Sequence, residues 1–100
     1  MKTFALIYTM LDIELSNRHR PEHVKFLADL VRNGKIDSGW KFPHYEPGAL
    51  QGILLCRAET ADEVRAWFAH DPVIVAGART FEVREALPMS VGAEPHPSKA

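Results

Sequence analysis

The chain has 100 residues, 46% of them hydrophobic and 25% charged, and its 12 Lys and Arg nearly balance its 13 Asp and Glu. These values are typical of one small globular domain, and the net charge of -1 disfavours nucleic acid or an anionic membrane as a partner. The single cysteine excludes an internal disulfide, no apolar run approaches the ~20 residues of a membrane span, and no cleavage site follows Met1-Lys2-Thr3, so we expect a cytoplasmic protein.

The first third of the chain predicts a strand and a helix. Residues 4–10 (FALIYTM) form an apolar run that is too short for a helix of usual length, so we expect a central strand with apolar groups on both faces. Residues 11–19 show no periodic pattern. Pro21 then opens a helix that runs to Asn33, with Gly34 as its stop.

Two further strands are predicted in the middle of the chain. Apolar and polar residues first alternate in steps of two, which indicates an edge strand with one dry face. The residues on that face are Ile36, Ser38, Trp40 and Phe42. A turn at residues 43–48 follows, and residues 52–58 (GILLCRA) are again apolar on both sides, so we expect a second central strand there.

The last part of the chain predicts a helix and a final strand. Thr60-Ala61-Asp62-Glu63 has the form of a capping box, so a helix begins near Thr60, and it breaks at Asp71 because the residue before a proline disfavours helical dihedral angles. After a short turn that ends at Gly77, alternation over residues 80–87 predicts the second edge strand. We expect residues 1–87 to form the domain and the tail, residues 88–100, to be mobile or docked on a partner subunit.

These elements follow the order βαββαβ. That order is compatible with a ferredoxin-like α+β fold, in which the first and third strands lie inside a four-stranded antiparallel sheet. Two helices cover only one face of such a sheet, whereas the first strand has apolar groups on both. We therefore expect a homodimer in which the open face of the sheet packs on the sheet of a partner subunit.

Two side chains are candidates for acid–base chemistry. His23 falls in the middle of the apolar arc of the first helix, either as a hydrogen-bonded core histidine or as a general base in a dry cleft. Asp71 is either the cap of a helix that begins at Pro72 or the carboxylate that orients His23, and one carboxylate can serve both roles. The acid–base interpretation requires the two side chains to be in contact.

Other residues are weaker candidates. The four-residue spacing of His19 and His23 allows zinc ligation, but no third ligand is recognisable and we expect no metal site. Arg18 and Arg20 flank His19 as a basic cluster, either in a solvated loop or as an attractant for an anionic or phenolate substrate. Cys56, in a covered strand, is expected to be an inert thiol.

Several short motifs stand in an informative order and spacing. They are Arg20-Pro21-Glu22-His23, Leu27 and Leu30, Gly34, a strand ending at Gly39, and Asp71-Pro72 followed by Gly77. From Met1 to about Leu87 the chain thereby resembles the YCII-like family, whose members are similar to muconolactone isomerases in fold. The resemblance implies a dimeric α+β barrel with His23 and Asp71 as a dyad at a cleft. Many relatives carry Gly-Pro where this chain has Gly39-Trp40, a departure that concerns the shape of the pocket.

The branch of this family with known chemistry removes hydrogen chloride from a chlorinated hydroxyhydroquinone. The resemblance therefore implies a lyase that acts on a small hydroxylated or chlorinated aromatic and gives a hydroxyquinone, with His23, held by Asp71, as general base and no metal or organic cofactor. The residues expected to contact the substrate are Met10, Arg20, Ser38, Trp40 and Phe42. The alternatives are a muconolactone-like isomerase, a non-catalytic dimer that binds a small molecule, and a partner-binding module that uses the tail.

Overall fold

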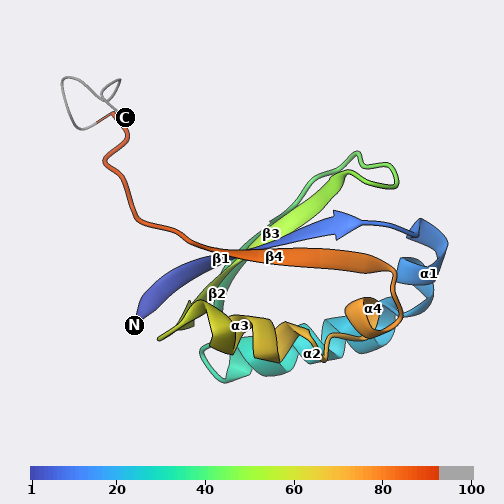
Figure 1. Ribbon diagram of the computed structural model, residues 1–100, viewed down its shortest axis with the longest axis horizontal. Coiled ribbons are helices and arrows are strands. Elements are labelled where there is room, and N and C mark those ends of the chain that lie inside the picture. Colours follow the sequence, from blue (N-terminus) through green and yellow to red (C-terminus); the bar gives the residue numbers. More distant parts are fainter. Residues whose placement is uncertain (93–100) are drawn as a thin grey trace.

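The computed structural model describes residues 1–92, which form one sheet with helices on one of its faces (Figure 1). The strands pair antiparallel in the order β2-β3-β1-β4, so the first and third strands lie inside, as predicted. The ferredoxin-like α+β fold is thereby confirmed. The elements are β1 (Lys2–Met10), α1 (Ile13–Arg18), α2 (Arg20–Arg32), β2 (Ile36–Lys41), β3 (Leu50–Ala58), α3 (Ala61–Phe68), α4 (Pro72–Val75) and β4 (Arg79–Glu85).

Helix α1 was not predicted, and α4 was expected only in the alternative in which Asp71 caps a helix that begins at Pro72. Helix α1 lies in the segment that shows no periodicity, where the Asp12 carboxylate caps it by accepting from the Leu15 N–H at 3.0 Å. Helix α4 is a single turn, in place of the expected turn after Asp71. Neither helix is long enough to repeat an apolar pattern, so sequence periodicity does not reveal them. By contrast, α3 begins as its capping box predicts, because Thr60 Oγ1 accepts from the Glu63 N–H at 3.2 Å.

The hydrophobic core lies between the sheet and the helices. Along β1, alternate side chains point into this core and are at most 3% exposed, whereas the residues between them are half-buried on the other face. The core-facing residues of β1 are Phe4, Leu6, Tyr8 and Met10. Facing them from the helices are Leu30 of α2, Val64 and Phe68 of α3, and Val73 of α4. The helices are therefore held against one face by apolar burial, the dominant stabilising contribution to folding.

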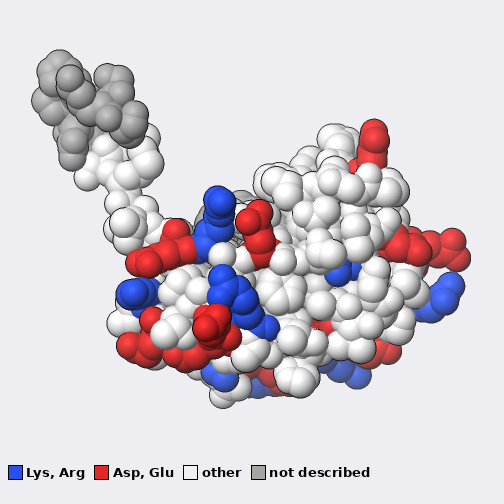
Figure 2. Space-filling view, viewed as in Figure 1, with Lys and Arg blue, Asp and Glu red and all other residues white. Residues whose placement is uncertain are grey.

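The opposite face of the sheet is not covered by any helix among residues 1–92 (Figure 1). At its centre Ala5 pairs with Leu55 and Ile7 with Ile53, so four apolar side chains from the two inner strands lie together. Charged side chains of both signs gather over the helices and the β4 end, and few are seen on the β2–β3 hairpin in this view (Figure 2). The uncovered centre is thus an apolar surface.

The prediction of one dry face on the edge strand β2 is wrong. Ile36 pairs with Cys56, but Ser38 pairs with the adjacent Leu55, so Asp37 is an extra residue that forms a β-bulge. Because directly opposed residues share a face, Ile36 lies on the helix side, whereas Ser38 lies on the open side with Leu55. An alternating sequence cannot reveal such an inserted residue.

The same bulge places Trp40 opposite Ile53 on the open side, where it is 58% exposed. Phe42, just past the end of β2, is 37% exposed. Beyond β4 the chain leaves the sheet, and Leu87 and Met89 are exposed. The remainder of the predicted tail, residues 93–100, lies outside the described residues. None of the helices in residues 1–92 is long and apolar enough to cross a membrane.

Candidate active site

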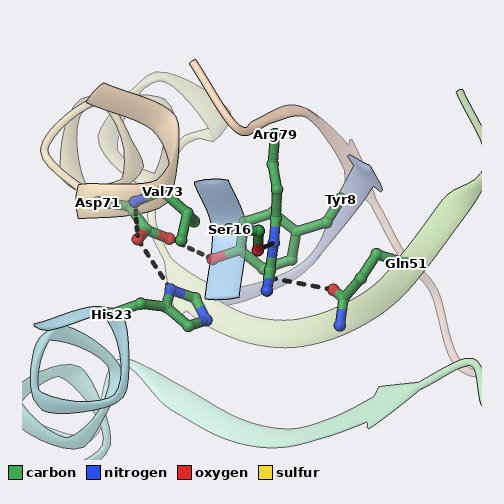
Figure 3. Close-up of polar contacts among 7 residues, drawn as sticks. All are labelled: Tyr8, Ser16, His23, Gln51, Asp71, Val73 and Arg79. Carbon is green, nitrogen blue, oxygen red and sulfur yellow. Dashed lines mark hydrogen bonds and ion pairs between the residues drawn. The ribbon is translucent and has the colours of Figure 1, made fainter. Parts of the chain in front are cut away.

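A buried carboxylate joins three elements of the fold (Figure 3). Asp71, which is fully buried, caps α4 by accepting from the Val73 N–H at 3.2 Å through Oδ1. The same oxygen lies 2.8 Å from Nδ1 of His23, in the first turn of α2. The other oxygen, Oδ2, accepts from the Tyr8 hydroxyl of β1 at 2.5 Å. The structure thus brings His23 and Asp71 together, and the aspartate is both a helix cap and a partner of the imidazole.

This contact fixes which nitrogen of His23 is available for chemistry. A carboxylate only accepts hydrogen bonds, so in the neutral imidazole Nδ1 carries the proton and Nε2 keeps its lone pair. His23 is 6% exposed and lines a cleft, and no residue in the described part of the chain bonds its Nε2. The arrangement therefore presents an oriented, unoccupied basic nitrogen to the cleft, which is the geometry that a general base needs.

Tyr8 supports this pair as a neutral phenol. Burial raises the pKa of its hydroxyl far above the ordinary value, the negative charge of Asp71 and the hydrogen bond to it raise the pKa further, and the Arg79 cation opposes these effects. Tyr8 therefore stays protonated and donates to Asp71. Its ring also stands edge-on to the imidazole of His23, with the ring centroids 5.8 Å apart.

Arg79, the first residue of β4, supplies a buried cation to the same site. Its side chain is 6% exposed, and the guanidinium carbon lies 5.0 Å from the centroid of the Tyr8 ring. Arg79 Nε donates to Oγ of the buried Ser16 at 3.0 Å, and Nη1 donates to Gln51 Oε1 at 3.2 Å. Gln51 is the extra residue of a second β-bulge, because Tyr8 pairs with Gly52 whereas Thr9 pairs with Leu50.

The cleft beside this network has a volume of about 280 Å³. It lies between α2 and the β2 side of the sheet, and its polar lining includes the cations of Arg20, Lys41 and Arg79 together with His23. The full lining consists of Tyr8, Asn17, Arg20, His23, Val24, Leu27, Gly39, Trp40, Lys41, Tyr45, Gln51, Ile53, Leu54 and Arg79. A space of this size fits a single aromatic ring with its substituents.

The structure places only part of the predicted substrate-binding set at this cleft. Arg20 lines it, and Trp40 borders it although its side chain lies on the open side of the sheet, whereas Met10, Ser38 and Phe42 do not line it. Met10 is fully buried at the end of β1, the Asp37 bulge turns Ser38 to the open face of the sheet, and Phe42 lies past the end of β2. Both Ser38 and Phe42 had been assigned to the expected dry face of β2, which the bulge rules out.

Tyr8, Arg79 and Gln51 were missed by the sequence analysis. Tyr8 looks like any apolar core residue of a central strand. The alternation of the last strand does extend back to Arg79, which shares a face with Phe81 and Val83. An arginine at the head of an apolar strand face is a signal of a buried cation, and it could have been found. Gln51 gave no signal, because its position depends on a bulge.

The remaining candidates take no part in this network. Burial, and to a lesser degree the charge of Asp37, raises the pKa of the Cys56 thiol to about 12, so that it is an inert core thiol, as expected. His19 lies at the junction of α1 and α2. Within residues 1–92, no group of three or more His, Cys, Asp or Glu is placed to hold a metal ion.

Comparison with known proteins identifies the family of the chain and a solved structure of similar fold. The family model of the YCII-related domain matches residues 1–90. No curated protein matches the sequence. Among solved structures, 5-chloro-2-hydroxyhydroquinone dehydrochlorinase (TftG) from Burkholderia phenoliruptrix AC1100, in complex with 2,5-dihydroxybenzoquinone, is similar with a TM-score of 0.69. The similarity covers 85% of this chain and 93% of that chain at 20% sequence identity, so it establishes a common fold.

Proposed function

The chain belongs to the YCII-related family, and on that premise we propose that it is a cofactor-independent lyase acting on a small hydroxylated aromatic. The substrate that best fits the similarity to the dehydrochlorinase is a chlorohydroxyhydroquinone, which would give a hydroxyquinone. The observation that carries the proposal is the free Nε2 of His23, which faces a ring-sized cleft while Nδ1 is held by Asp71.

The first step is a proton transfer within the bound ring. His23 Nε2 takes the proton of a ring hydroxyl, and the electron pair of that O–H bond moves into the ring. The resulting imidazolium is stabilised by Asp71, 2.8 Å from Nδ1. The negative charge that develops on the ring oxygen is stabilised by the cations of the cleft, Arg20 among them. His23 then returns the proton to the carbon that bears chlorine.

The second step expels chloride. His23 Nε2, free again after the first step, takes the proton of a second ring hydroxyl, the electron pair of that O–H bond forms the quinone carbonyl, and the C–Cl bond breaks with both of its electrons leaving on chloride. The net change is the loss of one HCl. Conversion of the hydroquinone to the quinone is a two-electron oxidation, and replacement of C–Cl by C–H at one ring carbon is a two-electron reduction. The two changes cancel, so the reaction needs no external oxidant.

The proposal is tested by mixing the protein with 5-chloro-2-hydroxyhydroquinone under anaerobic conditions, which suppress autoxidation. We expect catalytic release of chloride, followed with an ion-selective electrode, together with the ultraviolet spectrum of a hydroxyquinone. Protein denatured by heat serves as the blank. A rate no greater than that of the blank would exclude this substrate and favour an isomerase or a binding protein.

We also propose that two copies pair through the open face of the sheet. Ala5, Ile7, Ile53 and Leu55 form an apolar surface there that no helix of residues 1–92 covers, and such a surface promotes association in water. A partner sheet would bury it and close an α+β barrel. The exposed Leu87 and Met89 give the start of the tail apolar side chains that the partner would cover.

Pairing predicts that a charge at the centre of this surface prevents dimer formation. Ile7→Lys is expected to sediment as a monomer, whereas the wild-type protein sediments as a dimer. The matched control is Val75→Lys, since Val75 is 71% exposed on the helix side, and it is expected to remain dimeric. Sedimentation velocity separates the two states, and a monomeric wild type or a dimeric Ile7→Lys protein would contradict the proposed interface.

A further inference from the structure

Arg79 is a buried cation with no direct ion-pair partner in the described part of the chain. Arg79 is only 6% exposed, yet its hydrogen-bond partners, Ser16 and Gln51, are both neutral. No carboxylate in the described part of the chain forms an ion pair with it, and both oxygens of the nearby Asp71 are engaged by other donors. A desolvated guanidinium is costly unless an anion compensates it.

The guanidinium of Arg79, a residue that lines the cleft, keeps free donors. The hydrogen bonds of Arg79 use Nε and one proton of Nη1, so Nη2 has no partner among residues 1–92. Every fully buried side-chain nitrogen in this part of the chain has a partner, so Nη2 is not fully buried, and Arg79 is one of the residues that line the cleft. Ser16 and Gln51 hold the planar group on the Tyr8 ring and thereby fix the direction of this free edge (Figure 3).

The charged residues that line the cleft also favour an anionic ligand. Arg20 and Lys41 line it with Arg79, and no Asp or Glu does. In a chain whose net charge is only -1, such a one-signed lining is a local arrangement and not a reflection of overall composition. It attracts anions and repels cations.

We propose that Arg79 binds a negatively charged oxygen of the ligand, so that the cleft selects small planar anions. This anionic oxygen is a ring oxyanion or a carboxylate, either of which accepts two parallel hydrogen bonds or one charge-assisted bond from a guanidinium. His23 lines the same cleft, so a ligand held by Arg79 lies in the space that His23 also borders. The inference rests on the proposed function only in taking the ligand to be an aromatic ring.

The test is direct binding by isothermal titration calorimetry, with no turnover required. The probes are 2,5-dihydroxybenzoquinone, an anion at neutral pH through its acidic ring hydroxyls, 2,5-dihydroxybenzoate, and the neutral 2,5-dihydroxybenzamide. At least one anion is expected to bind about 10-fold or more tightly than the amide, the effect of one charge-assisted hydrogen bond. Binding of the quinone alone identifies a ring oxyanion, and binding of the benzoate alone identifies a carboxylate.

The variants assign the selectivity to Arg79. Arg79→Met keeps an unbranched side chain without charge and is expected to bind the anion no better than the amide. Arg79→Lys, which loses the planar fork, is expected to bind the anion several-fold more weakly than wild type with the amide unchanged, and it replaces Arg79→Met if that variant does not fold. The control Arg65→Met, on the exposed surface of α3, is expected to bind all probes as wild type does.

The inference is overturned if the amide binds as tightly as both anions, if neither anion binds, or if a folded Arg79 variant keeps the wild-type affinity for the anion. These outcomes are separate from those of the chloride assay. Selective binding without chloride release supports the anion site and counts against the proposed lyase reaction. Chloride release without any preference for anions has the opposite meaning.

Discussion

Replacement of His23 by asparagine is expected to lower kcat/KM for chloride release by about 10²–10⁴-fold while the protein stays folded. The asparagine Nδ2 occupies nearly the place of the imidazole Nδ1, so it can still donate to Asp71, which His23 contacts at 2.8 Å. What is lost is Nε2, the nitrogen that faces the cleft. An amide has no lone pair basic enough to accept a proton near neutral pH, so the proton transfer loses its base.

The matched control for this experiment is His70→Asn. His70 is exposed after the end of α3 and has no place in the cleft, so the same chemical change there should leave the rate unaltered. Initial rates of chloride release and thermal unfolding are measured for both variants. A His23→Asn protein with wild-type rates would mean that another group accepts the proton, and the role assigned to His23 would be abandoned.

Removal of the buried carboxylate is expected to have the largest effect on stability. Asp71→Ala leaves the Tyr8 hydroxyl, the His23 Nδ1–H and the Val73 N–H without their acceptor in the core. Breaking such a buried charged network costs about 3–5 kcal/mol of unfolding free energy. Asp62→Ala is the control, because the Asp62 side chain is 90% exposed and its ion pair with Arg65 contributes little.

Urea unfolding measures both variants, and a second substitution locates the cause. In a Tyr8→Phe background one of the three donors is already absent, so Asp71→Ala is expected to cost less there than in the wild-type background. Equal costs in the two backgrounds would show that Tyr8 and Asp71 are not coupled. A loss of less than about 1 kcal/mol for Asp71→Ala alone would contradict the network as a stabilising element.

The fold was largely predictable because its inner elements follow simple patterns. The apolar runs at residues 4–10 and 52–58 identify the two central strands, β1 and β3, and apolar periodicity identifies α2 with His23 on its buried side. These patterns arise because buried positions are occupied by hydrophobic residues, which can be recognised directly in the sequence. The short helix α1 shows no such pattern, because six residues held by the Asp12 cap do not complete two turns.

The site was only partly predictable, because it depends on long-range contacts and on inserted residues. His23 and Asp71 could be selected by residue type and by their place in predicted elements. Their third partner, Tyr8, contacts Asp71 across 63 positions of the chain, and no local pattern encodes that approach. The bulges at Asp37 and Gln51 change which face a side chain occupies, so Ser38 was placed in the pocket and Gln51 was left out.

The cleft is built from two kinds of residue whose freedom to vary differs. His23 and Asp71, with Tyr8 and Arg79 beside them, are buried, so changes there cost stability. The facing wall, with Lys41 of the edge strand β2, is exposed, and substitutions at exposed positions usually alter stability by no more than about 0.5 kcal/mol. Mutation can therefore reshape that wall while the buried pair proposed for proton transfer is inherited intact, which makes this architecture a favourable starting point for the evolution of new ligand ranges.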